Sequence, residues 1–109
     1  MTHFVNCTPH AITVEGLGTL PPSGIIPRCA TVRQEVDASW DVIANVRIVR
    51  QTFGEVQGLP EATPGIMLIV SGMVLGALNG SRPDVCAPDT GADAIRENGQ
   101  IVAVRGFVV

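Results

Sequence analysis

The sequence contains no lysine and no tyrosine, and all seven of its basic residues are arginine. Without lysine the chain cannot form a phosphate-binding loop of the Gly-x-x-x-x-Gly-Lys type. The arginines are spread along the chain and form no basic run, which argues against duplex nucleic acid as a partner. Single arginines can still bind a small anionic ligand, because the planar guanidinium group matches a phosphate or a carboxylate.

Cysteine is scarce as well: Cys7, Cys29 and Cys86 are odd in number and form no Cys-x-x-Cys pair. Neither histidine stands at metal-ligand spacing with a cysteine, so we expect no disulfide framework, no zinc site and no cofactor. Free thiols are typical of a reducing cytosol, and we expect a cytoplasmic protein. The longest apolar run, residues 66–78, is shorter than the about 20 residues that a membrane-spanning helix needs. We therefore expect no contact with a membrane.

The chain has few charged residues for its length. Its 109 residues suit a single domain, 1–109, but 46% are hydrophobic and only 16% are charged. This composition is apolar for a soluble monomer. It favours a homo-oligomer that buries apolar surface between subunits. The alternative is a compact monomer with a surface rich in glycine and proline.

Glycine and proline divide the chain into short segments, which predicts a mainly β (α+β) fold. We expect an antiparallel sheet of short strands with one short buried helix. A bulge is expected at Gly54, and residues 37–45 are ambiguous. Asn98-Gly99 predicts a type I′ hairpin between the last two strands. The expected strands span residues 3–6, 11–15, 25–36, 46–56, 66–70, 84–87, 94–97 and 101–108.

One helix is expected at residues 72–79. Ser71 is a suitable N-cap, and Asn79-Gly80 suits the C-terminal end. The segment is apolar on all sides, so we expect it to be buried on most of them. Gly72 and Gly76 are four residues apart, which favours close approach of a strand or of a sister helix.

Two arginines lie in apolar rows of expected strands. Alternate residues share one face of a strand, so Arg105 lies beside Ile101, Ala103 and Phe107. Both faces of residues 101–108 are apolar, which predicts a central or interfacial strand. Arg28 has a similar setting. A charge there needs a partner. The partner is either a carboxylate, such as Asp89 or Glu97, or an anionic ligand; a third possibility is that the side chain extends to solvent at an edge.

Two polar loops are also candidate sites. Residues 6–10 contain Thr8-Pro9, which predicts a turn that leads into the next strand, and His10 is a hydrogen-bonding turn residue or a ligand contact. Residues 88–91 suit a loop equally well. Asp89-Thr90-Gly91 matches the aspartic protease tripeptide, but its surroundings do not. The chain has no Gly-x-Ser-x-Gly nucleophile motif. We predict that the protein is not an enzyme.

Six short segments are spread over nearly the whole chain: Asn6-x-Thr8-Pro9-His10-x-Ile12, Pro21-Pro22-Ser23-Gly24, Gly58-Leu59-Pro60, Ile69-Val70-Ser71, Ala87-Pro88-Asp89-Thr90-Gly91 and Ile101-Val102-Ala103-Val104-Arg105. Together they resemble a family of small phage and prophage proteins. The size and general character of the chain are also similar, at the level of class, to the Thoeris anti-defence sponges, which sequester cyclic ADP-ribose isomers.

The resemblance implies a phage counter-defence protein in the infected bacterial cell. It would bind a nucleotide immune signal, a cyclic ADP-ribose isomer or a cyclic oligonucleotide, without cleaving it. Arg28, Arg96 and Arg105 would then bind phosphates. The residues expected to hydrogen-bond to ribose or base are Thr8, His10, Asp89 and Thr90. The alternatives are a protein that binds a host defence protein directly, a phage structural or assembly protein, and a hydrolase with His10 as base.

Overall fold

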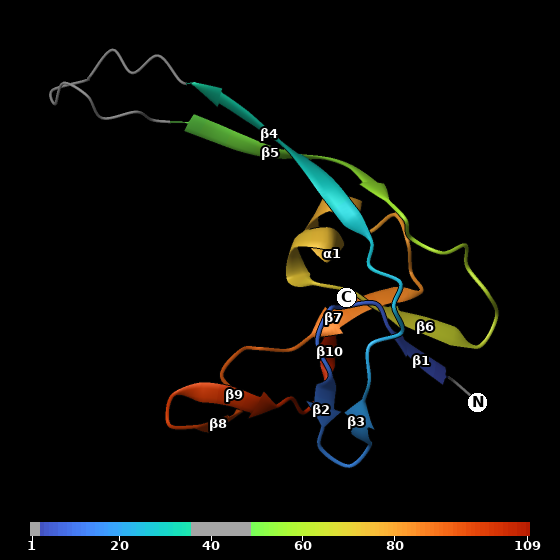
Figure 1. Cartoon of the computed structure of the whole chain (residues 1–109), viewed down its shortest axis with the longest axis vertical. Helices are drawn as coiled ribbons and strands as arrows, with labels where there is room; N and C mark the ends of the chain where they lie inside the picture. Colours follow the sequence, from blue (N-terminus) through green and yellow to red (C-terminus); the bar gives the residue numbers. More distant parts are fainter. Residues whose placement is uncertain (1–2, 36–48) are drawn as a thin grey trace, which may run out of the picture.

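The computed structural model describes residues 3–35 and 49–109, and the chain is mainly β, as predicted. Residues 37–45 and the start of the strand expected at 46–56 lie outside the described residues. Figure 1 shows the elements. They are β1 (His3–Asn6), β2 (Ile12–Val14), β3 (Gly18–Leu20), β4 (Arg28–Glu35), β5 (Val49–Gln57), β6 (Ile66–Ile69), α1 (Gly72–Leu78), β7 (Val85–Pro88), β8 (Ile95–Glu97), β9 (Gln100–Ala103) and β10 (Phe107–Val108).

The central sheet has the strand order β1-β6-β7-β10. β6 is parallel to both β1 and β7, and only β10 is antiparallel to its neighbour. The expectation of an antiparallel sheet is therefore wrong for the central sheet. The helix α1 lies between β6 and β7 in the chain, and such a crossover returns the chain in the same direction. Parallel strands are buried on both faces, which explains the unbroken apolar runs of β6 and β7.

The core lies between this sheet and α1. Its central cluster contains Cys7, Leu68, Val70, Val74 and Val85, all at most 5% exposed. Phe4 of β1 also stacks on Phe107 of β10 with ring centroids 5.1 Å apart. The stacked rings connect the two outer strands of the sheet, so β10 is held by its side chain as well as by its short ladder.

The helix has the predicted ends but not the predicted burial. Ser71 accepts a hydrogen bond from the Val74 N–H, and Asn79 adopts the left-handed conformation at the other end. Within α1, however, only Val74 is buried, and Met73 is 52% exposed. The prediction of a helix buried on most sides is wrong, because the described elements that contact the helix, β4, β5 and β7, leave Gly72, Met73 and Gly76 exposed.

Strands β4 and β5 form a two-stranded antiparallel ribbon that extends away from the central sheet (Figure 1). The pairing register shifts between Cys29 and Thr31, where β5 has one extra residue at Gly54 and Glu55. The predicted bulge is confirmed. Near the body, Cys29 and Val56 pack against the core cluster. Beyond the bulge most of the described side chains are exposed.

The C-terminal hairpin β8–β9 is confirmed, because Asn98 and Gly99 both have positive φ, 52° and 79°. The expected strand 101–108 is instead two strands. Val104 lies between them, and its N–H and carbonyl bond to Thr13 and Glu15 of the β2 segment. These bonds end the pairing of β9 with β8. Among the described elements β9 pairs with β8 alone, so the expectation of a central strand is wrong.

The described residues include no helix that is long and apolar enough to span a membrane.

Candidate functional site

The seven predicted ligand residues lie in three places. Thr8 and His10 are in the turn after β1, and Arg28 begins β4. The other four lie in or beside one loop, residues 89–94, between β7 and β8. Asp89 and Thr90 belong to the loop, and Arg96 and Arg105 lie beside it. This loop and its two arginines are the candidate site, because they are the largest group of predicted residues that the fold brings together.

The candidate loop begins with a turn that Asp89 stabilises. The Asp89 carboxylate accepts a hydrogen bond from the Gly91 N–H at 3.0 Å. A side chain at Gly91 would meet the same carboxylate oxygen at 3.1 Å, so glycine fits this position best. The Asp89 N–H donates to the Gly106 carbonyl at 3.0 Å, which joins the loop to the segment that carries Arg105.

Arg96 holds the same loop from β8. Its guanidinium donates to the carbonyls of Thr90, Gly91 and Ala94 at 3.0, 3.1 and 3.3 Å. These three carbonyls all face one side chain, so the loop closes around the guanidinium. Arg96 is therefore a structural residue of the site in this conformation, and its hydrogen-bond partners within the described part of the chain are all carbonyls.

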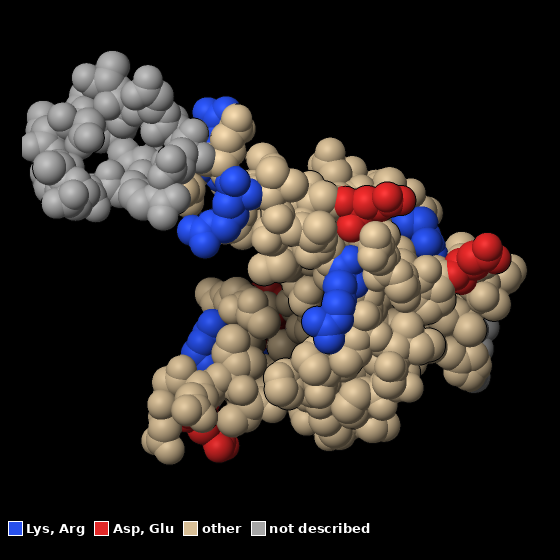
Figure 2. All heavy atoms as spheres, turned by 45° about the horizontal axis from the view of Figure 1, so that its top comes forward, with Lys and Arg blue, Asp and Glu red and all other residues tan. Residues whose placement is uncertain are grey.

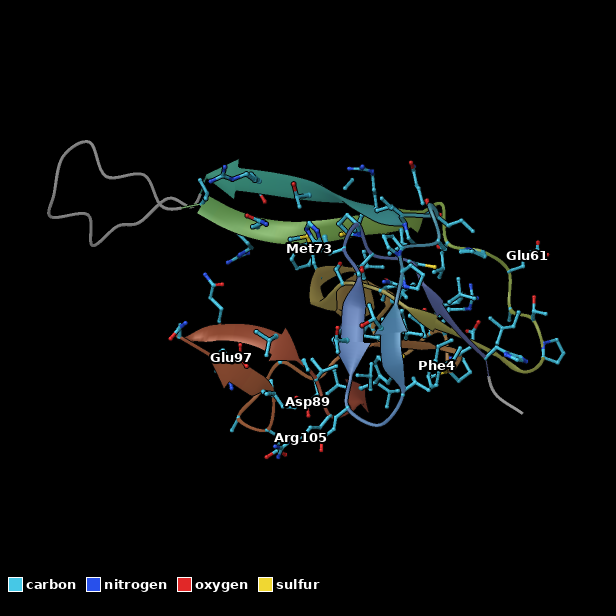
Figure 3. The ribbon with its side chains drawn as sticks, turned by 60° about the horizontal axis from the view of Figure 1, so that its bottom comes forward. Phe4, Glu61, Met73, Asp89, Glu97 and Arg105 are labelled. Carbon is cyan, nitrogen blue, oxygen red and sulfur yellow. The ribbon has the colours of Figure 1, made fainter. Side chains whose placement is uncertain are left out.

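Arg105 lies on the surface next to the loop, as Figure 3 shows for Arg105 and Asp89. Its Nε donates to Glu15 Oε2 at 2.9 Å, and both side chains are more than half exposed. The expectation that Asp89 or Glu97 pairs with Arg105 is therefore wrong. Among the described residues no hydrogen bond engages the two terminal nitrogens of Arg105. An ion pair this exposed is worth less than about 1 kcal/mol, so an anionic ligand can replace Glu15 at little cost.

The turn after β1 is organised by Asn6, a residue that the sequence reasoning did not select. Its side-chain amide donates to the carbonyls of His10 and Leu20 at 2.8 and 3.0 Å. Its Oδ1 accepts from the N–H and the hydroxyl of Thr8 at 3.0 and 2.6 Å. Thr8 is buried by these contacts, whereas the His10 side chain is exposed. The prediction of a shaped turn at residues 6–10 is confirmed.

Arg28 lies on a different element from the 89–94 loop, at the start of β4. It pairs with Gln57 at the base of the ribbon, and its side chain is exposed. Among the described residues it forms no ion pair within 4.0 Å. Among the described residues, no hydrogen bond or ion pair joins Arg28 to Thr8 or to Arg105.

Among the residues that the structure describes, the best-formed ion pair belongs to a different arginine. Arg82 donates through Nε and Nη2 to both oxygens of Asp84 at 2.8 Å, and through Nη2 to the Pro60 carbonyl at 2.9 Å. These hydrogen bonds hold the pKa of the Asp84 carboxyl below its usual value. The pair is only partly exposed and ties β7 to the loop before β6, so it is a structural contact.

Arg82 also borders a groove of about 650 Å³ beside α1. The groove is mostly apolar, with Leu75 and Leu78 on one side and Val108 and Val109 on another. It contains none of the seven predicted ligand residues. Most of its lining residues lie within residues 72–85, and Val108 and Val109 complete it, so the groove forms only where these two segments meet.

The thiols and carboxylates offer no metal site within residues 3–35 and 49–109: no group of three or more histidine, cysteine, aspartate or glutamate side chains is suitably placed. Cys7 and Cys86 are buried, and both are free thiols. Burial raises the pKa of the Cys7 thiol, and it raises the pKa of the Cys86 thiol to about 11. At neutral pH both are protonated and poor nucleophiles.

Fold and site together define a mainly β protein with an arginine-flanked surface loop. Comparison with protein-family models, with curated proteins and with solved structures finds no match to this chain.

Proposed function

We propose that the protein binds and sequesters an anionic nucleotide, without cleaving it, at the loop formed by residues 89–94. In the phage setting that the sequence resemblance implies, the ligand is a cyclic ADP-ribose isomer or a cyclic oligonucleotide signal in the cytoplasm of the infected bacterium. In this proposal the protein acts as a homo-oligomer, and the nucleotide binds between subunits.

The observation that carries this proposal is the position of two guanidinium groups around one polar loop. Arg96 closes the loop, and Arg105 presents terminal nitrogens beside it with only an exposed carboxylate as partner. Guanidinium groups bind phosphate through paired hydrogen bonds. The Thr90 hydroxyl and the Asp89 carboxylate add groups of the kind that bind a ribose. Glu15 would have to turn away from Arg105, and its exposure allows this.

The described part of the molecule also favours a second function. Ten large hydrophobic side chains are more than a third exposed. Figure 2 shows acidic and basic side chains dispersed over one face, with no large area of one sign. Such a surface suits protein contacts, so direct binding to a host defence protein or a role in phage assembly is the second candidate.

The test is a depletion experiment with the purified protein. Cyclic dinucleotides, cyclic trinucleotides and cyclic ADP-ribose isomers are each incubated with it, and the free nucleotide is measured by mass spectrometry. The protein is then denatured by heat and the measurement repeated. Depletion followed by release of the intact nucleotide is the expected result. Release of a product would instead identify an enzyme, and no depletion across the panel would favour the protein-binding alternative.

Arg105→Ala is the decisive variant. We expect it to weaken nucleotide binding by at least about tenfold, because it removes the more available guanidinium. Its melting temperature should change little, since only an exposed ion pair is lost. Arg50→Ala on the ribbon is the matched control, with the same change in net charge far from the loop, and should bind as the wild type does. Equal binding by Arg105→Ala and wild type would refute the proposed site.

A further inference from the structure

The chain contains two asparagine–glycine pairs, Asn79-Gly80 and Asn98-Gly99. The backbone nitrogen of a glycine can attack the side-chain amide of a preceding asparagine, because glycine has no side chain to hinder the approach. Both asparagines are exposed, and both adopt the left-handed conformation, with φ of 49° and 52°. This conformation directs the following nitrogen away from the side chain, so neither pair can react until its backbone rotates. The reactivity of each pair therefore depends on how easily its segment opens.

Asn79 is held firmly at the C-terminal end of α1. Its N–H donates to the Gly76 and Leu75 carbonyls at 3.2 and 3.3 Å. The Ser81 N–H donates to the Leu78 carbonyl at 3.0 Å, which closes the next turn. Leu75 and Leu78 also pack against the core cluster. Rotation of the backbone at Asn79 would therefore break the helix end and disturb the packing of the core.

Asn98 lies in the turn of the β8–β9 hairpin, which has fewer attachments. Glu97 pairs with Gln100, so Asn98 and Gly99 are the two central residues of the turn, and the Gly99 N–H lies outside the ladder. Among the described strands, β8 and β9 pair only with each other, and residues 96–102 are all exposed.

The hairpin also lies apart from the core. Of the described residues that form the core cluster or pack against it, none belongs to β8 or β9. Figure 1 shows the hairpin projecting from the body of the molecule. Segments with few buried contacts are those that open most readily in a folded protein. The backbone at Asn98 therefore rotates at a lower cost in free energy than the backbone at Asn79.

We propose that Asn98 is a site of spontaneous deamidation, with water as the only co-reactant, and that the fold protects Asn79. The Gly99 nitrogen bonds to Asn98 Cγ, and the bond from Cγ to Nδ2 breaks. The proton of the attacking nitrogen passes through solvent to the leaving amide, which departs as ammonia. Water then opens the cyclic imide at either of its carbonyls, so the product is aspartate or isoaspartate.

This inference goes beyond nucleotide binding and does not rest on it. The reaction adds one negative charge to the formal net charge of −3. Isoaspartate also carries the main chain through the side chain, which lengthens the backbone of a two-residue turn. The modified residue directly follows β8, the strand that carries Arg96 and so supports the 89–94 loop.

The test is incubation of the purified full chain in mildly alkaline buffer, followed by cleavage after arginine. Cleavage places Asn98 in the peptide of residues 97–105 and Asn79 in a different peptide. Mass spectrometry then measures the conversion of amide to acid in each peptide over time, and chromatography separates aspartate from isoaspartate. We expect Asn98 to convert at least about tenfold faster than Asn79, because local opening is the step that differs between them.

Two controls make the result specific. In guanidinium chloride the fold is lost, and the two pairs should convert at similar rates. Asn98→Ser should abolish the change in the 97–105 peptide, which excludes Gln100 as its source. Equal conversion of Asn79 and Asn98 in the folded chain would overturn the proposal. A tenfold difference that persists in the denaturant, or a change that persists in Asn98→Ser, would overturn it as well.

Discussion

Asn6 joins three segments that are separate in the sequence. It hydrogen-bonds through its side chain to Thr8 and His10 in the following turn and to Leu20 at the end of β3. Its carbonyl accepts from the Ser23 N–H as well. The residue is 3% exposed, so its side chain makes these hydrogen bonds away from bulk water. The polar cluster at residues 6–10 is thus a structural junction first.

We expect Asn6→Ala to lower the free energy of unfolding by about 2–4 kcal/mol, because it removes the side-chain partner of the buried Thr8 N–H and of the Leu20 carbonyl. The measurement is chemical denaturation at neutral pH. Thr13→Ala is the control: it removes an exposed hydroxyl pair with Thr19 and should cost less than about 0.5 kcal/mol. A cost for Asn6→Ala no greater than that of the control would show that the junction contributes little.

At the scale of elements, α1 shows how a helix can have clear end signals and still be partly exposed. Its cap residues act locally, and the sequence predicts them well. Its burial depends on what lies opposite. A Cβ atom built at Gly72 or Gly76 meets nothing within 4 Å in the chain, so no described strand uses these glycines for close approach.

Gly76→Ala should therefore stabilise the protein by about 0.5–1 kcal/mol, since alanine has the higher helix propensity. Gly80→Ala is the matched substitution with the opposite expectation. Its site is equally open, but Gly80 has a φ of 77°, which costs an alanine about 1–2 kcal/mol. Thermal denaturation of both variants checks the pair. Destabilisation by Gly76→Ala would indicate that a sister helix packs there, as the glycine spacing suggested.

At the scale of the whole molecule, the buried core is small and contains two ionisable groups. Cys7 and Cys86 are 2% and 1% exposed. The chain has no lysine and no tyrosine, which are the side chains that ordinarily titrate near pH 10. The raised pKa values of the buried Cys7 and Cys86 thiols therefore affect stability without overlap from lysine or tyrosine side chains.

Stability should therefore fall as the solution becomes alkaline. Burial raises the pKa of the Cys86 thiol from 9.0 to about 11, so the unfolded chain loses this proton first. The stabilisation is fully present below pH 9. It is lost at roughly 1.4 kcal/mol per pH unit as the pH rises to about 11. Cys7, whose pKa is also raised, adds a change of the same sign.

The measurement is urea denaturation at several values between pH 8 and pH 11, in the presence of a reductant. Cys86→Ala is the control, and its unfolding free energy should depend less steeply on pH than that of the wild type. A wild-type stability that stays constant from pH 9 to pH 11 would contradict the prediction, as would an unchanged slope in the variant.

Features that depend on neighbouring residues were predicted from the sequence. The Ser71 and Asn79 caps, the Asn98-Gly99 hairpin, the bulge at Gly54 and the turn at residues 6–10 follow from backbone preferences over a few residues. The candidate loop was predicted in the same way, because Pro88, Asp89 and Gly91 favour a turn wherever they are placed. Each of these signals is read within one short segment, so no long-range information is needed.

The composition and local pattern of the sequence thus determined the β class, the short helix, its ends and the turns. The parallel order β1-β6-β7 was decided by the tertiary structure, because strand order depends on which distant segments meet. The Arg105 partner was decided there too: Glu15 is 90 residues away, and nothing in its local pattern links the two. The exposure of Met73 and Phe53 has the same origin, since an apolar side chain is buried only where another element is present to cover it.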